Sequence, residues 1–353
     1  MKHFWLIPVI LCGGLWVACE DPPVASYPQP KAKPIETPKV PASSFTLQDF
    51  NASNPDHQRI RRAICRDLEI KDNELTQAHL AKVERLDLFG EEIERIDPVQ
   101  SLVGLKRLNI HGNKVVDLSP LKNLLAMEVL EASDNRISDV SALAELTRMK
   151  VLHLKKNAIS DIAPLEKLTR LISLDLGRNQ IEEVEAIRGM VELNWLALGA
   201  NRVRRIEALA GLNRLRHLYL ERNRLSGASL QSIEGLKAMR TLSLRGNQVD
   251  DISPLTGMKQ MSWLELDENR IADVSPLADM VLMEKLYIEN NRISILEPLV
   301  ELVALKRFMA RGNNIPSRQS TLLSKALPNC REFKAGVFST IPTRRRPSNQ
   351  KDK

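Results

Sequence analysis

The sequence contains the stretch LISLDLGRN at residues Leu171–Asn179, and close copies of it recur along most of the chain. Cutting the chain every 22 residues keeps these copies in register, as in the units 146–167 and 168–189. Each unit follows Leu-x-x-Leu-x-x-Leu-x-Leu-x-x-Asn-x-Ile-x-Asp-Ile-x-Pro-Leu, and VDDISPL at Val249–Leu255 is a clear copy of the second half. A fixed period of about 20 to 50 residues is typical of solenoid proteins. We therefore expect eleven stacked repeats over residues 80–316.

The alternation Leu-x-Leu predicts a short strand with one apolar face, because successive strand residues point to opposite sides. Stacking would place Leu152 and Leu154 next to Leu174 and Leu176, which gives a parallel sheet with one buried face. An asparagine recurs where each strand ends, and its amide can pair with backbone groups that turn inward there. We interpret this column as structural: Asn113, Asn135, Asn157, Asn179, Asn201, Asn223, Asn247, Asn269, Asn291 and Asn313.

This pattern resembles the leucine-rich-repeat family, specifically the short 22-residue type of bacterial internalins and of a eukaryotic phosphatase-regulating subunit. The resemblance covers about two thirds of the chain. It implies an α/β solenoid with a curved parallel sheet on the concave face. The segment of each repeat that runs from the asparagine back to the next strand is too short for a full helix and carries prolines. We therefore expect 3₁₀ or extended segments on the convex side.

Both ends of the array depart from the repeat. We expect a helical N-terminal cap over residues 57–79 and a C-terminal cap over 317–330 with a helix at 320–327. Such caps cover apolar layers that would otherwise face water. The first repeat has Glu91 in place of the asparagine, and the repeat that begins at Leu212 has 24 residues and should hold a helical turn.

Residues 1–18 have the features of an export signal, because Lys2 precedes an apolar stretch shorter than the about 20 residues of a membrane span. The sequence LWVAC at residues 15–19 resembles the lipobox of bacterial lipoproteins. That resemblance implies that Cys19 is diacylated after cleavage and anchors the protein to a membrane. An uncleaved anchor is the alternative, and both interpretations export the chain. Residues 19–56 are rich in proline, so we expect a disordered tether.

The net charge of +7 lies mainly in residues 331–353, which carry seven Lys or Arg against Glu332 and Asp352. We expect a disordered basic tail there. The repeats themselves are nearly balanced in charge, so a nucleic-acid partner is not expected.

Cys65 and Cys330 lie at opposite ends of the array, too far apart for a disulfide, and Cys65 is expected to be a buried thiol.

The strand positions that point away from the core are free of packing constraints, and they differ between the two halves of the array. In the first five repeats they are mixed and polar. From Trp195 to Arg311 they include every Trp and Tyr of the repeats, together with several acids. Aromatic residues with polar neighbours are enriched at binding hot spots. We expect a ligand-binding surface at Trp195, His217, Tyr219, Glu221, Arg245, Trp263, Glu265, Asp267, Lys285, Tyr287 and Glu289.

The sequence allows two other interpretations of this surface. The rings could only cover neighbouring strands, since aromatic residues favour sheets in general. A metal site is disfavoured, because His111, His153 and His217 would be about 10 to 14 Å apart at the spacing of strands. The sequence has no glycine-rich phosphate loop and no nucleophile elbow. We therefore expect neither enzymatic activity nor a cofactor.

These observations predict a non-catalytic scaffold, acting as a monomer at the outer membrane or surface of a bacterial cell. Its ligand would be a protein or peptide that bears basic groups. A carbohydrate or envelope-polymer binding module is an alternative, in which Trp195 or Trp263 would stack on sugar rings. A regulatory subunit of an enzyme is another alternative, and that function would not require an export signal.

Overall fold

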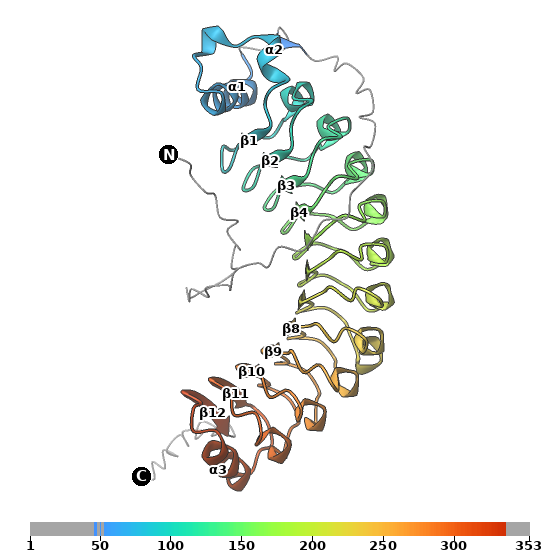
Figure 1. Ribbon diagram of the computed structural model, residues 1–353, viewed down its shortest axis with the longest axis vertical. Helices are drawn as coiled ribbons and strands as arrows, with labels where there is room; N and C mark the ends of the chain where they lie inside the picture. Colours follow the sequence, from blue (N-terminus) through green and yellow to red (C-terminus); the bar gives the residue numbers. More distant parts are fainter. Residues whose placement is uncertain (1–45, 48–49, 51–52, 337–353) are drawn as a thin grey trace, which may run out of the picture. The chain divides into compact units, whose positions relative to one another are not determined.

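The computed structural model describes residues 46–47, 50 and 53–336 (Figure 1). The expected export signal, Cys19 and most of the tether at residues 19–56 lie outside this range, as do residues 337–353 of the tail. Within it, the chain forms one sheet of twelve parallel strands in sequence order. None of the helices among these described residues combines the length and the apolar character that crossing a membrane requires.

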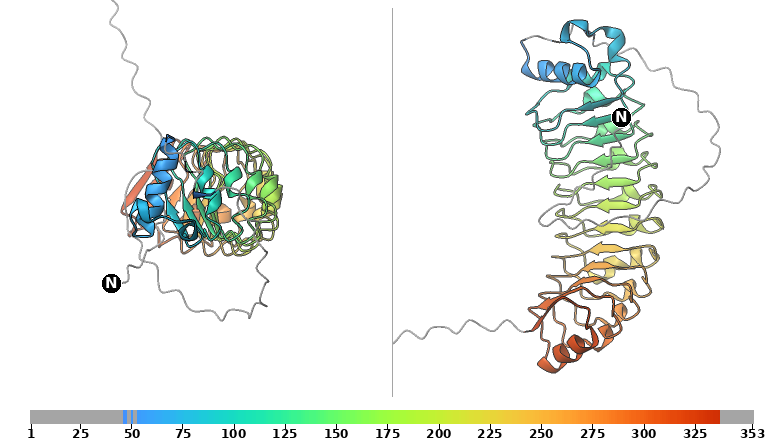
Figure 2. Two further views of the ribbon diagram at one scale, coloured as in Figure 1. Left: turned by 90° about the horizontal axis from the view of Figure 1, so that it is seen from above. Right: turned by 60° about the vertical axis from the view of Figure 1, so that its left-hand side comes forward.

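Each repeat contributes one strand, and the strands line the inner side of the repeat array (Figure 1). Figure 2 shows them side by side along this face. The strands are β1 Arg85–Asp87, β2 Arg107–Asn109, β3 Val129–Glu131, β4 Val151–His153, β5 Ser173–Asp175, β6 Trp195–Ala197, β7 His217–Tyr219, β8 Thr241–Ser243, β9 Trp263–Glu265, β10 Lys285–Tyr287, β11 Arg307–Arg311 and β12 Glu332–Gly336.

The opposite side of the array consists of 3₁₀ turns, as the prolines of the repeat predicted. In several repeats an aspartate begins the turn; the Asp139 carboxylate, for example, accepts hydrogen bonds from the backbone N–H and the hydroxyl of Ser141. The irregular repeat holds the longest turn, which is 3₁₀ rather than α-helical. The turns are η3 Asp97–Ser101, η4 Ser119–Leu121, η5 Ser141–Leu143, η6 Ala163–Leu165, η7 Glu185–Ile187, η8 Glu207–Leu209, η9 Gly227–Ile233, η10 Ser253–Leu255, η11 Ser275–Leu277 and η12 Glu297–Leu299, and a further 3₁₀ turn, η2 Asp72–Glu74, lies in the N-terminal cap.

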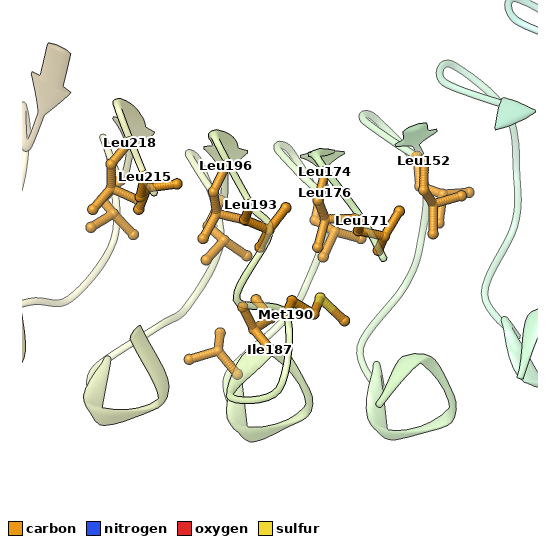
Figure 3. Close-up of a cluster of buried hydrophobic side chains, with 14 of the residues drawn as sticks. Leu152, Leu171, Leu174, Leu176, Ile187, Met190, Leu193, Leu196, Leu215 and Leu218 are labelled. Atoms are coloured by element: carbon orange, nitrogen blue, oxygen red, sulfur yellow. The ribbon is translucent and has the colours of Figure 1, made fainter. Parts of the chain in front are cut away.

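The leucines stack in register, as the repeat predicted. Leu174 pairs with Leu152 on one side and with Leu196 on the other, and all three are fully buried (Figure 3). Burying a leucine side chain is worth about 1.5 to 3 kcal/mol. Each layer is covered by its neighbours, so the stability of one repeat depends on the adjacent repeats.

The asparagine column is also confirmed as structural. The Asn179 amide donates to the carbonyls of Leu154 and Leu176, both at 3.0 Å, and its oxygen accepts from the N–H of Ile159 at 3.0 Å. Asn201 makes the same bonds one repeat further on. The column therefore satisfies buried backbone groups and ties each repeat to the one before it.

The N-terminal cap consists of helices α1 Pro55–Asp67 and α2 Gln77–Leu80. Helix α1 starts earlier than the expected boundary at residue 57, because the Asn54 side chain caps it and Pro55 occupies its first turn. The last residues assigned to the tether are thus helical. Helix α1 contacts β1 and buries Ile60 and Ile64.

The C-terminal cap begins with helix α3 Ser317–Ala326, directly after Pro316. The expected boundary between this cap and a disordered tail at residue 331 is wrong, because Glu332–Gly336 forms β12 and extends the sheet. The reason is packing: the Phe333 ring lies 5.2 Å from the buried ring of Phe308 on β11. Cys330 lies in this cap and Cys65 in α1, and both are free thiols.

Candidate binding surface on the strand face

The strand residues that point away from the core form three rows across the sheet. The first row contains the first residue of each strand, such as Trp195 on β6, and the second row contains the third residue, such as Tyr219 on β7. The third row lies two residues further on, at Gly199, Glu221 and their equivalents. All eleven residues expected to bind a ligand lie in these rows, which we call the concave surface.

Trp195 lies at the centre of an aromatic group on this surface. Its ring centroid is 5.6 Å from that of Tyr219 and 5.8 Å from that of His153, with tilted ring planes. His153 is held between strands by the Glu131 carboxylate at 2.8 Å and the Ser173 hydroxyl at 2.9 Å. Such ring contacts restrict side-chain motion, so these rings form a preorganised group on the surface.

Glu221 is packed against a glycine of the neighbouring repeat. A Cβ atom at position 199 would collide with its carboxylate, so Gly199 is what leaves room for that group. One oxygen of Glu221 is buried and accepts no hydrogen bond from the residues described. Burial raises the pKa of Glu221, and nearby Glu265 raises it further. Burial also raises the pKa of Tyr219, to about 12.

Asp175 resembles Glu221 in its surroundings. Its carboxylate accepts a hydrogen bond from the N–H of Gly177 at 2.9 Å. Burial nevertheless raises its pKa, and Lys155 and His153 oppose this rise. The Asp175 and Glu221 carboxylates are thus both largely buried, in a region where Gly177, Ala197 and Gly199 supply no large side chains.

Trp263 and Glu265 form a second group on β9. The Trp263 indole donates to Glu265 at 3.2 Å, and the Ser243 hydroxyl donates to the other oxygen at 2.8 Å. The Lys285 ammonium lies over the Trp263 ring, 4.6 Å from the centroid, in a cation–π contact. Glu265 is therefore held by neutral donors, while the nearby lysine is occupied by the ring.

Asp267 follows on the third row and is almost fully buried, with 8% of its surface exposed. It accepts a hydrogen bond from the Glu289 N–H at 2.7 Å. Burial raises its pKa to about 6, and the Glu265 and Glu289 carboxylates add to this rise, whereas Arg245 opposes it. Arg245 itself pairs with Glu268 at 2.6 Å.

Two other residues of the expected site, Tyr287 and His217, contact side chains of neighbouring strands. Tyr287 accepts a hydrogen bond from Arg307 at 3.1 Å, and Arg307 pairs with Glu332 of β12 at 2.6 Å. A ring nitrogen of His217 lies 3.1 Å from the Thr241 hydroxyl. His217 is in register with Trp195 on one side and with Thr241 on the other, so it lies between the Trp195 and Trp263 groups, whereas Tyr287 lies beside Glu265.

Five carboxylates of the concave surface form no salt bridge with the described residues. No salt bridge within the described part of the chain involves Asp175, Glu221, Glu265, Asp267 or Glu289. We call these five the acidic centre. They leave a negative region flanked by aromatic rings.

The sequence did not predict the part that the earlier repeats play. His153, Glu131 and Asp175 join the Trp195 group, although the site was expected to begin at Trp195. The signal was the run of small residues at 177, 197 and 199, which allows large neighbours to lie across the strands. Among the residues described, no three His, Cys, Asp or Glu side chains are arranged to hold a metal ion.

Comparison with known proteins identifies the repeats. A family model for two copies of leucine-rich repeats matches residues 147–189, and a second leucine-rich-repeat model matches residues 205–249. No curated protein matches the chain by sequence.

Solved structures share the fold. An internalin, InlF, from Listeria monocytogenes has a TM-score of 0.70 and 27% identity, over 80% of this chain and 92% of that chain. A leucine-rich-repeat protein of Leptospira interrogans has a TM-score of 0.67 and 22% identity, over 73% and 67%. A plant peptide hormone receptor, RGFR1, solved in complex with RGF2, has a TM-score of 0.60 and 18% identity, over 74% and 48%. The chain is thus a leucine-rich-repeat solenoid similar to an internalin.

Proposed function

We propose that the protein is a non-catalytic scaffold that binds a protein or peptide ligand bearing basic groups on its concave surface. The observation that carries this proposal is the acidic centre: its five carboxylates form no salt bridge with the described residues, and one of them, Glu265, accepts a hydrogen bond from the Trp263 indole. Keeping unpaired carboxylates in a partly buried place is unfavourable for folding. A cationic ligand would supply the missing partners.

A protein or peptide ligand fits the rings better than a sugar does. Sugar stacking needs an open face of an indole, but one face of Trp263 is covered by the Lys285 ammonium. Trp195 lies between His153 and Tyr219. The leucine-rich-repeat fold also holds RGF2 in the plant receptor complex, although that similarity concerns the fold alone.

The proposed location is a bacterial cell envelope, with the chain exported and held by a lipid on Cys19. This part of the proposal rests on the LWVAC sequence at residues 15–19. The similarity to an internalin is in keeping with a domain outside the cytoplasm. A ligand at the envelope would then meet the concave surface of an anchored domain.

The double variant Trp263→Ala/Tyr287→Ala tests the binding surface. Truncating two central aromatic residues of an interface typically costs over 1 kcal/mol each, so we expect affinity to fall by about 10- to 100-fold. The ligand is first isolated from envelope extracts with the wild-type protein, and its affinity is then measured by calorimetry.

Phe89→Ala is the matched control, because Phe89 is an exposed aromatic residue on the same surface but in the first repeat. We expect this variant to bind like the wild type. Equal affinity of the double variant and the wild type would contradict the proposal.

A further inference from the structure

The chain leaves the sheet at a defined point next to the acidic centre. On the last strand, Gly336 of β12 is in register with Arg311 of β11. Arg311 is a third-row residue, so Gly336 extends the row that contains Glu289 and Asp267. The residues that follow Gly336 therefore start at the same edge of the concave surface as these two carboxylates.

The segment that follows Gly336 has the opposite charge to the acidic centre. Residues 337–353 contain Arg344, Arg345, Arg346, Lys351 and Lys353, and Asp352 is their single acid. The charges near β12 do not offer this segment a better partner. Glu332 is already paired with both Arg307 and Lys334.

The distances allow contact. Asp267 follows β9, which lies three strands from β12, or about 14 Å at the usual strand spacing. The eight residues from Gly336 to Arg344 span up to about 26 Å when extended. Arg311 lies nearer than the acids and offsets part of the negative charge at Glu289, so the attraction is strongest around Glu265 and Asp267.

We propose that the arginine run Arg344–Arg346 of this same chain lies on the acidic centre, near Glu265 and Asp267, when no other ligand is bound. The run supplies the cationic partners that the described residues do not provide. A bidentate guanidinium suits carboxylates at a surface that also presents aromatic rings. Any external basic ligand would have to displace this segment.

A photo-crosslinking residue, p-benzoylphenylalanine at position 347 of the full chain, tests the contact. We expect cross-links, mapped by mass spectrometry, on concave-surface residues of β8 to β11. The variant Arg344→Gln/Arg345→Gln/Arg346→Gln keeps the length of the segment and should lose most of them. Glu265→Gln/Asp267→Asn/Glu289→Gln should lose them as well.

The matched control is Glu166→Gln/Glu234→Gln/Glu301→Gln, which removes three exposed acids that follow the 3₁₀ turns. This control should keep the cross-links. Circular dichroism should give the same folded spectrum for the arginine variant and the wild type, because the changed residues lie beyond β12.

A second measurement uses a free peptide of residues 337–353. The arginine variant should bind this peptide on the order of tenfold more tightly than the wild type, because a tethered segment competes at millimolar effective concentration. Neither experiment needs an external partner, so failure of the proposed function and failure of this inference can be told apart.

Three results would overturn the inference. Cross-links on the 3₁₀ side, or cross-links that persist in both charge variants, would show that the acids do not hold the segment. Cross-links between isotopically labelled and unlabelled chains would show that a second copy is the partner. Equal peptide affinity for the wild type and the arginine variant would show that the surface is not occupied by the chain itself.

Discussion

Carboxylates just before the strands, at the edge of the sheet where the strands begin, and carboxylates of the acidic centre have opposite surroundings. At the edge, an acid faces a lysine of the next repeat, as in Glu128 with Lys150 at 2.8 Å and Glu284 with Lys306 at 2.7 Å. In the acidic centre, Asp267 lies next to Glu289 instead. A solenoid places equivalent positions side by side, so alternating signs stabilise neighbouring repeats and repeated signs destabilise them. The like charges of the acidic centre therefore destabilise the fold, although they favour binding of a cationic ligand.

The pKa shifts have opposite signs in the two regions. The hydrogen bond from Lys150 lowers the pKa of Glu128, whereas burial raises the pKa of Asp267 to about 6. The Glu128 contribution to stability is thus present above the unfolded pKa and is lost as the pH falls through the lowered folded value. The Asp267 contribution is present below the unfolded pKa of about 3.8 and is lost as the pH rises through about 6.

Among the changes that test this contrast, Asp267→Asn should have the largest effect on the free energy of unfolding. The amide oxygen can still accept the Glu289 N–H, but the charge that burial penalises is removed. Made in the Arg344→Gln/Arg345→Gln/Arg346→Gln chain, where the C-terminal segment does not offset the Asp267 charge, this change should raise the free energy of unfolding at pH 7.5 by about 1 to 3 kcal/mol, with little change at pH 3.5. Urea denaturation at the two pH values measures this.

Asp139→Asn serves as the control with the opposite sign. Hydrogen bonds from Ser141 lower the pKa of Asp139, so this change should destabilise the protein at pH 7.5. A loss of stability in Asp267→Asn at pH 7.5 would contradict the interpretation of the acidic centre.

Gly199→Ala should have a smaller effect. The added methyl group would push the flexible Glu221 carboxylate towards water, which lowers its pKa towards the ordinary value. Alanine also restricts the unfolded chain, so we expect stability at pH 7.5 to rise by about 0.5 to 1 kcal/mol.

Gly189→Ala is the matched control for this change, because its Cβ would meet only the Thr169 methyl group at 3.4 Å. It should give the entropic gain without a change in the pH dependence of stability. Identical pH profiles for the two glycine variants would show that Glu221 does not move.

Glu128→Gln should have the smallest effect. Both Glu128 and Lys150 are more than a third exposed, and exposed pairs contribute about 0.5 kcal/mol. We expect a loss of that size in low salt and almost none in 1 M salt, measured by thermal denaturation. A loss above about 1.5 kcal/mol would mean that the edge pairs matter more to the array than surface ion pairs usually do.

The fold could be predicted from the sequence to a large extent because the repeat specifies it many times over. The leucine layers, the asparagine column and the 3₁₀ side all follow from one 22-residue pattern. Strand β12 was missed because it has no asparagine and no leucine. Its signal was the pair Phe333 and Ala335, which copies Phe308 and Ala310 of β11.

The candidate site could be predicted only in part. The repeat shows which side chains leave the core, and so it places Trp195, Tyr219, Trp263 and Glu265 on one surface. It does not show which neighbouring side chains those residues contact. The packing of Glu221 over Gly199 and the contact of Trp195 with His153 depend on the size of neighbours in other repeats, which a pattern of leucines does not encode.

Strand β12 also bears on how two copies of the protein would meet. The last strand of a sheet has unpaired backbone groups and can recruit a strand from another chain. If two copies paired antiparallel about the centre of β12, Lys334 of one would face Lys334 of the other, and like charges directly opposite are unfavourable. The charged edge therefore works against the joining of two arrays end to end into a dimer.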